Sequence, residues 1–494
     1  MEAIMRASGI LLHITSLPSP YGIGALGEEA YRFAEFLHSA GQKYWQMLPV
    51  GPTSYGDSPY QSFSAFAGNP YFIDLPLLIA DGLLTKEEAE EPFWGDDPGR
   101  VDYCAVYGAR LPLLKKACAR GYERDYEAIA AFEEEHAFWL PDYALFMALK
   151  SQFDMRPWTE WPEDIRLREE ESLEQYRELL REEIRFYTYL QFLFFRQWKA
   201  FKDHCEKLDI LLIGDIPIYV ALDSADVWAN PALFLLDEER RPTHVAGVPP
   251  DYFSEDGQLW GNPLYDWANM EHDGFAWWMR RISATARLFD MLRIDHFRGF
   301  SSYWSVPRGE KTARNGVWRK GPGRAFIDAL KLNFPALPII AEDLGMLSQD
   351  VYELMEYAGY PGMRVLQFAF DTLSEDSFQP HTYPVACVCY TGTHDNDTVM
   401  GWLKNGEPEA VGYAAEYLSL SQPEGLNWGF IRGGMSSVAE LFVAQMQDYL
   451  GLDTWARMNL PSTTGCNWCW RMLPDMAGGE LAKKIRRVTD MYGR

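Results

Sequence analysis

The chain has 494 residues, of which 47% are hydrophobic and 23% are charged, and its net charge is −26. This composition is typical of a globular protein and excludes global disorder. A strongly acidic surface repels phosphate groups, so we expect neither nucleic acid nor a membrane surface as a partner.

The seven cysteines are an odd number in a long chain, which favours reduced thiols over a disulfide framework. Cys466 and Cys469 have the spacing of half a metal site, but no second pair follows at a suitable distance. We therefore expect no metal, and no organic cofactor is implied. The start of the chain has no basic segment followed by an apolar one, and no apolar run approaches the ~20 residues of a membrane helix. These features favour a cytoplasmic protein.

The first 50 residues alternate between strand-like and helix-like patterns. Residues 9–18 form a short apolar run typical of a buried strand, residues 26–40 have apolar positions at helical spacing, and residues 45–50 predict a second strand. A strand, a helix and a strand in this order predict a parallel sheet. Residues from about 76 to 208 then predict a mostly helical insertion subdomain, in which 174–207 has the pattern of one long helix.

Strand-like runs return after this insertion, and helical patterns lie between several of them. The predicted strands are 210–215, 291–295, 338–342, 363–368 and 385–390, and the predicted helices include 275–289, 324–332 and 349–358. The strand-like runs are apolar on both faces, as a parallel sheet covered on both sides requires. We expect the α/β class and a (β/α)8 TIM barrel with largely helical insertions between its strands, forming one domain over residues 1–494.

Carboxylates follow the predicted strands at matching positions. Asp215, Asp295 and Glu342 each end a strand, and Asp395 comes shortly after another. The C-terminal ends of barrel strands converge on one face, where active sites lie. One such residue alone is more often a helix cap or a turn former, but four in similar contexts favour a shared site. Paired carboxylates with separated pKa values are what glycosyl transfer needs.

The surroundings of two carboxylates suggest different roles. Arg293 lies two residues before Asp295, so the two side chains share a face of the strand, and the guanidinium favours the ionised form that a nucleophile needs. Glu342 follows the apolar residues 338–341, and partial burial would raise its pKa, which suits a general acid. Aromatic residues make up 15% of the chain. They are consistent with a large core and with a groove whose rings stack on sugars, and composition alone does not separate the two.

Motifs around these residues occur in order along nearly the whole chain. They are SGILLH at 8–13, GDSPYQ at 56–61, SAFAGNP at 64–70, GDIPIY at 214–219, VAGVPPDYFS at 245–254, GQLWGNP at 257–263, RIDHFR at 293–298, AEDLG at 341–345 and GTHDNDT at 392–398. Together they closely resemble the amylomaltase and disproportionating-enzyme family, glycoside hydrolase family 77.

The resemblance implies a 4-α-glucanotransferase. Such an enzyme moves an α-1,4-glucan segment from a maltooligosaccharide or starch donor to the 4-hydroxyl of an acceptor glucan or glucose, with retention and through a covalent glycosyl-enzyme. Asp295 matches the nucleophile, Glu342 the acid/base, and Asp395 the carboxylate that binds the 2- and 3-hydroxyls. Residues implied to bind substrate are Tyr60, Asp215, Tyr252, Phe253, Trp260, Arg293, His296 and His394. Tyr55 and Tyr103 are implied to form a second, remote glucan site.

The stretch from about 245 to 265 is expected to be a loop that covers the active-site groove, excludes water and so favours transfer over hydrolysis. Two alternatives stay open: an α-glucan hydrolase on the same scaffold, and a glucan-binding protein without catalysis. Ordinary packing is the alternative role for Tyr103 and Phe253. The chain departs from the family where Ser462 follows Pro461 and where Cys466 precedes Asn467, since the family usually has Gly at both positions, and both side chains need more backbone room than Gly.

Overall fold

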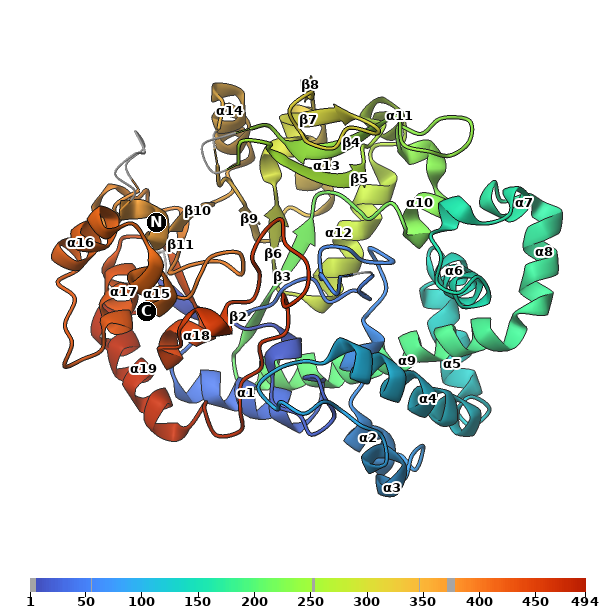
Figure 1. Ribbon diagram of the computed structural model, residues 1–494, viewed down its shortest axis with the longest axis horizontal. Helices are drawn as coiled ribbons and strands as arrows, with labels where there is room; N and C mark the ends of the chain where they lie inside the picture. The colour runs from blue at the N-terminus through green and yellow to red at the C-terminus, as the bar shows by residue number, and fades with distance from the viewer. Residues whose placement is uncertain (1–5, 55, 251–253, 346, 371–377) are drawn as a thin grey trace.

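The computed structural model describes residues 6–54, 56–250, 254–345, 347–370 and 378–494. Over these residues, eight strands form one sheet in the order β10-β11-β12-β1-β2-β3-β6-β9, and all its pairings are parallel (Figure 1). The strands are β1 (Ala7–Leu11), β2 (Tyr44–Gln46), β3 (Leu211–Pro217), β6 (Met291–Asp295), β9 (Ile339–Ala341), β10 (Gly362–Val365), β11 (Cys387–Tyr390) and β12 (Leu441–Gln445).

The two edge strands of this sheet, β9 and β10, meet and nearly close it into a barrel. The Ala341 backbone N–H donates to the Pro361 carbonyl at 3.0 Å. Just after β9, the Asp343 carboxylate accepts a hydrogen bond from the Met363 N–H in β10 at 2.6 Å and pairs with Arg364 at 2.9 Å. The predicted α/β barrel is therefore confirmed.

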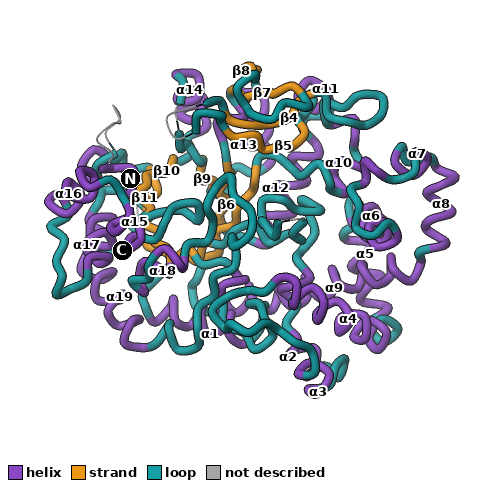
Figure 2. The backbone as a smooth tube through the Cα atoms, in the orientation of Figure 1, coloured by secondary structure: helices purple, strands orange, loops and turns teal. Residues whose placement is uncertain are grey.

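Helices surround the barrel strands, as Figure 2 shows. Their apolar positions fall on one face, as helical spacing predicts: α1 (Glu28–Ser39) buries Ala30, Phe33, Ala34 and Leu37. The other helices of this layer that the sequence predicts are α12 (Ala276–Leu288), α13 (Gly323–Asn333) and α14 (Gln349–Ala358). The C-terminal helix α19 (Gly479–Tyr492) lies beside α1, where Thr489 accepts a hydrogen bond from Gln42 at 2.9 Å.

Residues between β2 and β3 contain a block of helices, at the right and lower right of Figure 1. The helices are α2 (Leu75–Ala80), α3 (Lys86–Glu90), α4 (Tyr103–Gly121), α5 (Tyr126–Glu135), α6 (Leu140–Gln152), α7 (Glu163–Arg166), α8 (Glu170–Leu179) and α9 (Arg181–Lys207). The single helix predicted over 174–207 is wrong. Leu180 has φ −105° and ψ 21°, outside the helical region, and separates α8 from α9.

The long helix α9 holds the segment that leads from β2 to the helical block. The buried side chain of Gln191 accepts a hydrogen bond from the Gly68 N–H at 2.8 Å and donates to the Gly68 carbonyl at 3.0 Å. Gln197 makes the same pair of contacts with the backbone of Asp74, at 2.7 and 3.2 Å. Because irregular backbone needs partners when it is buried, these two glutamines fix the segment that also carries Tyr60.

A second, antiparallel sheet lies at the top of Figure 1 and consists of β5-β4-β7-β8 over the described residues. Its strands are β4 (His244–Val248), β5 (Gln258–Pro263), β7 (Ser302–Pro307) and β8 (Val317–Lys320). The stretch over about 245–265, expected as a loop, thus contains two paired strands, because β4 pairs with the distant β7 as well as with β5. Tyr252 and Phe253 lie outside the described residues.

Candidate active site

Arg293 is the centre of a carboxylate cluster at the C-terminal ends of the barrel strands. It lies on β6, opposite Asp215 on β3. Its Nη1 donates to both Asp215 oxygens at 2.7 Å, and its Nη2 donates to Asp295 Oδ1 at 2.8 Å. The Arg293 and Asp215 side chains are 4% and 1% exposed, whereas that of Asp295 is 29% exposed. Arg293 therefore pairs with two carboxylates, and Asp295 is the one that a ligand can reach.

Glu342, directly after β9, is the carboxyl of the cluster best suited to hold a proton. It is buried, and its two oxygens accept hydrogen bonds from the backbone N–H groups of His296 and Leu344, both at 2.7 Å. Burial first, and then the negative charge of Asp295, raise the pKa of Glu342 to about 8, while Arg293 and the two backbone bonds act in the opposite direction. A protonated carboxyl beside an ionised one is the arrangement that separates a general acid from a nucleophile.

His296 adopts a backbone conformation that is unusual for a residue with a side chain, with φ 53°. This turn directly after β6 aims its N–H at Glu342. Its ring lies edge-on to the ring of Trp260 in β5, with centroids 4.8 Å apart. Burial lowers the pKa of His296 to about 4, so the ring is neutral at neutral pH. Strained backbone of this kind gathers at functional sites, where the surrounding structure maintains it.

Tyr60 and His394 bring two distant motifs together. Their rings are stacked, with centroids 4.8 Å apart and an interplanar angle of 19°. The Tyr60 hydroxyl donates to Asp215 Oδ2 at 2.7 Å and lies 3.3 Å from His394 Nδ1. Trp468 packs beside both rings, at 6.0 and 5.8 Å. Tyr60, Asp215 and His394 are thus placed together as the sequence analysis expects, and stacking of Tyr60 on a sugar remains a prediction.

The environment of Asp395 contains a residue that the sequence analysis missed. Asn459 Nδ2 donates to Asp395 Oδ1 at 2.7 Å, and His394 Nε2 lies 3.3 Å from the same oxygen. Asn459 is 64 residues away from Asp395 in the chain, and no strand or helix pattern links the two. The contact forms only when the chain folds, so no local sequence pattern points to it.

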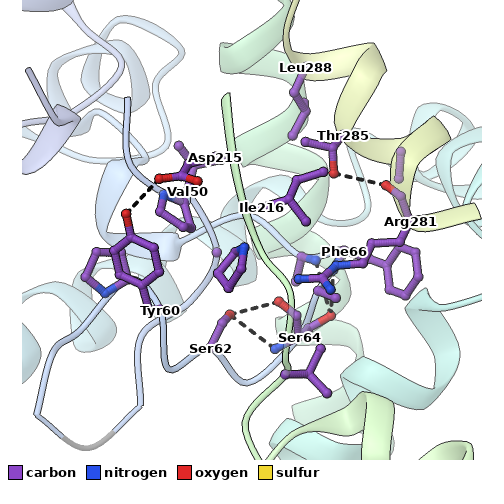
Figure 3. Close-up of a pocket in the computed structure, with 18 of the residues that line it drawn as sticks. Val50, Tyr60, Ser62, Ser64, Phe66, Asp215, Ile216, Arg281, Thr285 and Leu288 are labelled. Atoms are coloured by element: carbon purple, nitrogen blue, oxygen red, sulfur yellow. Dashed lines mark hydrogen bonds between the residues drawn. The ribbon is translucent and has the colours of Figure 1, made fainter. Parts of the chain in front are cut away.

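A cavity of about 70 Å³ lies beside this cluster (Figure 3). It shares Tyr60 and Asp215 with the cluster and extends along β3 toward Arg281 and Thr285 of α12. Asp295, Glu342 and Asp395 do not line it. The cavity is therefore a neighbour of the carboxylates, and the chemistry they suggest would take place outside it.

Tyr103, at the start of α4, has a packing role in the structure. Its ring packs against a small apolar cluster that includes Val101 and Val106, and its hydroxyl donates to the Trp468 carbonyl at 2.9 Å. Tyr55, its expected companion, lies outside the described residues. The remote glucan site therefore remains a prediction.

The two departures from the resembled family lie in a tight loop after Asn459. Ser462 has φ 63°, a left-handed conformation that Gly adopts at no steric cost. Cys466 is exposed. The Asn467 side chain accepts a hydrogen bond from the Leu460 N–H at 3.1 Å and donates to the Thr463 carbonyl at 3.1 Å, which keeps the loop closed.

The described residues show neither a candidate metal site nor a candidate membrane span. No group of three or more His, Cys, Asp or Glu side chains there is arranged to hold a metal ion. In the same parts of the chain, no helix combines the length and the apolar character that a membrane span requires.

Sequence similarity to known proteins extends over nearly the whole chain. The profile of a family described as 4-alpha-glucanotransferase, glycoside hydrolase 77, matches residues 12–476. A 4-alpha-glucanotransferase of Clostridium butyricum is 51% identical and aligns over 98% of this chain and 100% of its own. One of Thermus thermophilus is 50% identical and aligns over 99% of both chains.

Solved structures show the same similarity. An amylomaltase from Streptococcus agalactiae in complex with acarbose has a TM-score of 0.97 to this structure, at 41% sequence identity and with 99% of each chain covered. An amylomaltase from Corynebacterium glutamicum, at 19% identity, shares the fold with a TM-score of 0.79 and covers 98% of this chain and 75% of its own.

Proposed function

Because the chain belongs to glycoside hydrolase family 77 and shares the 4-α-glucanotransferase activity of that family, we propose that Asp295, Glu342 and Asp395 carry out the transfer in two displacements that retain the anomeric configuration. The observation that carries this proposal is the pair formed by Asp295, bound to Arg293, and the buried Glu342 with its raised pKa. Two carboxyl groups with these different environments supply the nucleophile and the general acid that such a transfer requires.

In the first displacement, the Asp295 carboxylate attacks the anomeric carbon of the donor glucan. The bond to the leaving chain breaks, and its oxygen takes the proton of Glu342. The product is a glycosyl ester of Asp295. Arg293 stabilises the attacking carboxylate before the bond forms, and the two backbone N–H groups on Glu342 stabilise the carboxylate left behind after proton transfer.

In the second displacement, the ionised Glu342 takes the proton of an acceptor 4-hydroxyl, whose oxygen attacks the anomeric carbon and releases Asp295. The donors are maltooligosaccharides or α-1,4-glucan chains, and the acceptors are glucans or glucose. Asp395 accepts hydrogen bonds from the 2- and 3-hydroxyls of the sugar, and Tyr60, Asp215, His296 and His394 complete its surroundings. Trp260, which meets the His296 ring, forms part of a cover that excludes water.

Transfer by the purified protein is tested with maltotriose as the only substrate. We expect a ladder of longer maltooligosaccharides together with glucose, because each glycosyl-enzyme is resolved by a sugar hydroxyl. Chromatography over time distinguishes this result from hydrolysis. Glucose and maltose without longer products would instead support the α-glucan hydrolase alternative.

We expect kcat/KM for maltotriose to fall as the pH rises through about 8. Burial and Asp295 raise the pKa of Glu342 to about 8. Below that pH the carboxyl is protonated and can donate to the leaving oxygen, and above it the proton is lost. The parameter kcat/KM reports the first displacement, so the pH profile for maltotriose should fall on the alkaline side. The profile for α-maltosyl fluoride should fall less, because its leaving group needs no proton. Equal limbs for both donors would assign the titration to another group.

A further inference from the structure

A short segment after β12 returns to the loop that carries Asp395. The Asn459 side chain donates to Asp395 Oδ1 at 2.7 Å, and its backbone N–H donates to the His394 carbonyl at 3.1 Å. Arg457 Nη2 donates to the Asp395 carbonyl, and its Nε donates to the Asn459 carbonyl at 2.7 Å. Both the side chain and the backbone of Asp395 are thus held by residues 457–459.

Contacts with two other parts of the chain hold residues 457–459 in place. Met458, between the two residues that hold Asp395, is buried, and its carbonyl accepts a hydrogen bond from the Trp468 N–H at 2.6 Å. The hydroxyl of Ser16 contacts its sulfur at 3.5 Å. Trp468 also packs beside the Tyr60 and His394 rings. A support fixed in this way can determine the orientation of the group it holds.

The two carboxylate oxygens of Asp395 have different hydrogen-bond surroundings. Oδ1 takes the hydrogen bond from Asn459 and the contact with His394 Nε2, while the side chain as a whole is 46% exposed. One oxygen is therefore fixed by the protein, and no described residue donates a hydrogen bond to Oδ2, which leaves that oxygen available to a sugar hydroxyl. Because the amide of Asn459 is neutral, it fixes the carboxylate without cancelling the negative charge that stabilises an oxocarbenium-like centre.

We propose that Asn459 and Arg457 are positioning residues for Asp395: Asn459 sets the rotation of its carboxylate and Arg457 sets its backbone, so that Oδ2 meets the sugar hydroxyls. The inference rests on the role of Asp395 proposed above. It adds a dependence of the transfer reaction on two residues outside the cluster of catalytic carboxylates.

The first test is Asn459→Ala, measured with maltotriose. We expect kcat to fall by about 10- to 100-fold, the cost of a catalytic group that is slightly misplaced, with a smaller change in KM. Asn269→Ala is the matched control, because it removes an amide hydrogen bond of 2.8 Å to the Ala232 carbonyl away from the site. The control should keep wild-type kcat. Should Asn459→Ala fail to give a thermal unfolding midpoint near that of the control, Asn459→Ser is measured in its place.

The second test separates positioning from a structural role by repeating the substitution in an Asp395→Asn background, with α-maltosyl fluoride as a reactive donor. If Asn459 acts through the carboxylate, Asn459→Ala should cause little further loss there, because residues that act as a unit are not additive. Losses that multiply would overturn the inference. A fully active Asp395→Asn single variant would overturn the proposed role of Asp395 itself, and with it the inference.

Discussion

Asp295→Asn is expected to reduce maltotriose transfer by at least ~10⁴-fold, the scale on which loss of a catalytic nucleophile acts. An amide cannot form the glycosyl ester, and no other carboxylate described in the cluster combines contact with Arg293 and exposure to a ligand as Asp295 does. Binding of maltooligosaccharides should remain, because Asp215 still pairs with Arg293 and the sugar-binding side chains are unchanged. Product chromatography measures the loss, and titration calorimetry measures the binding.

The matched control for this variant is Asp142→Asn. Asp142 also pairs with an arginine, Arg168, at 2.7 Å, but it lies in α6 of the helical block. This substitution should leave transfer unchanged, so that a loss in Asp295→Asn can be attributed to the position of Asp295 and not to removal of an Asp–Arg pair as such. Turnover near the wild-type rate in Asp295→Asn would exclude it as the nucleophile.

The parts of the structure that could be predicted are those with a local pattern. β6 is predicted with its observed bounds, Met291–Asp295, because its apolar run ends sharply at a charged residue. The ends of such strands also place Asp215 and Glu342, since a parallel barrel brings them to one face. The family could be identified from its motifs because they are short local segments, several of which lie on strands or directly after them, and the comparisons confirm it.

The parts that could not be predicted depend on distant segments. β12 was not singled out, although its five residues are buried, because a single short apolar run is not distinctive. The stretch 245–265 is rich in Gly and Pro, which suggests a loop, but β4 and β5 within it pair with each other, and β4 also pairs with the distant β7. Asn459 gains its role from a contact across 64 residues, and Leu180 interrupts a helical pattern that continues on both sides.

Glu342→Gln should lose most transfer from maltotriose and keep measurable glycosylation by α-maltosyl fluoride. The amide cannot give a proton to the leaving oxygen of a glucan, whereas fluoride departs without one. The effect on glycosylation should therefore be about 10²- to 10⁴-fold for maltotriose, the usual contribution of a general acid, and much smaller for the fluoride.

The second displacement provides an independent check on Glu342→Gln, because this variant also lacks the base that activates the acceptor. With α-maltosyl fluoride the glycosyl-enzyme should accumulate and be visible by mass spectrometry as a modified Asp295. Addition of azide, a nucleophile that carries no proton at neutral pH, should then restore turnover and give a glycosyl azide with the donor's anomeric configuration. Equal losses in the glycosylation step for both donors would exclude Glu342 as the acid.

A Glu342→Asp variant is a further comparison. In Glu342→Gln only one of the two carboxylate positions is an oxygen, so only one of the backbone N–H groups of His296 and Leu344 keeps its hydrogen bond. Glu342→Asp keeps an ionisable group but places it farther from the leaving oxygen, so it should be slow with maltotriose. The more base function it retains, the less azide should accelerate it.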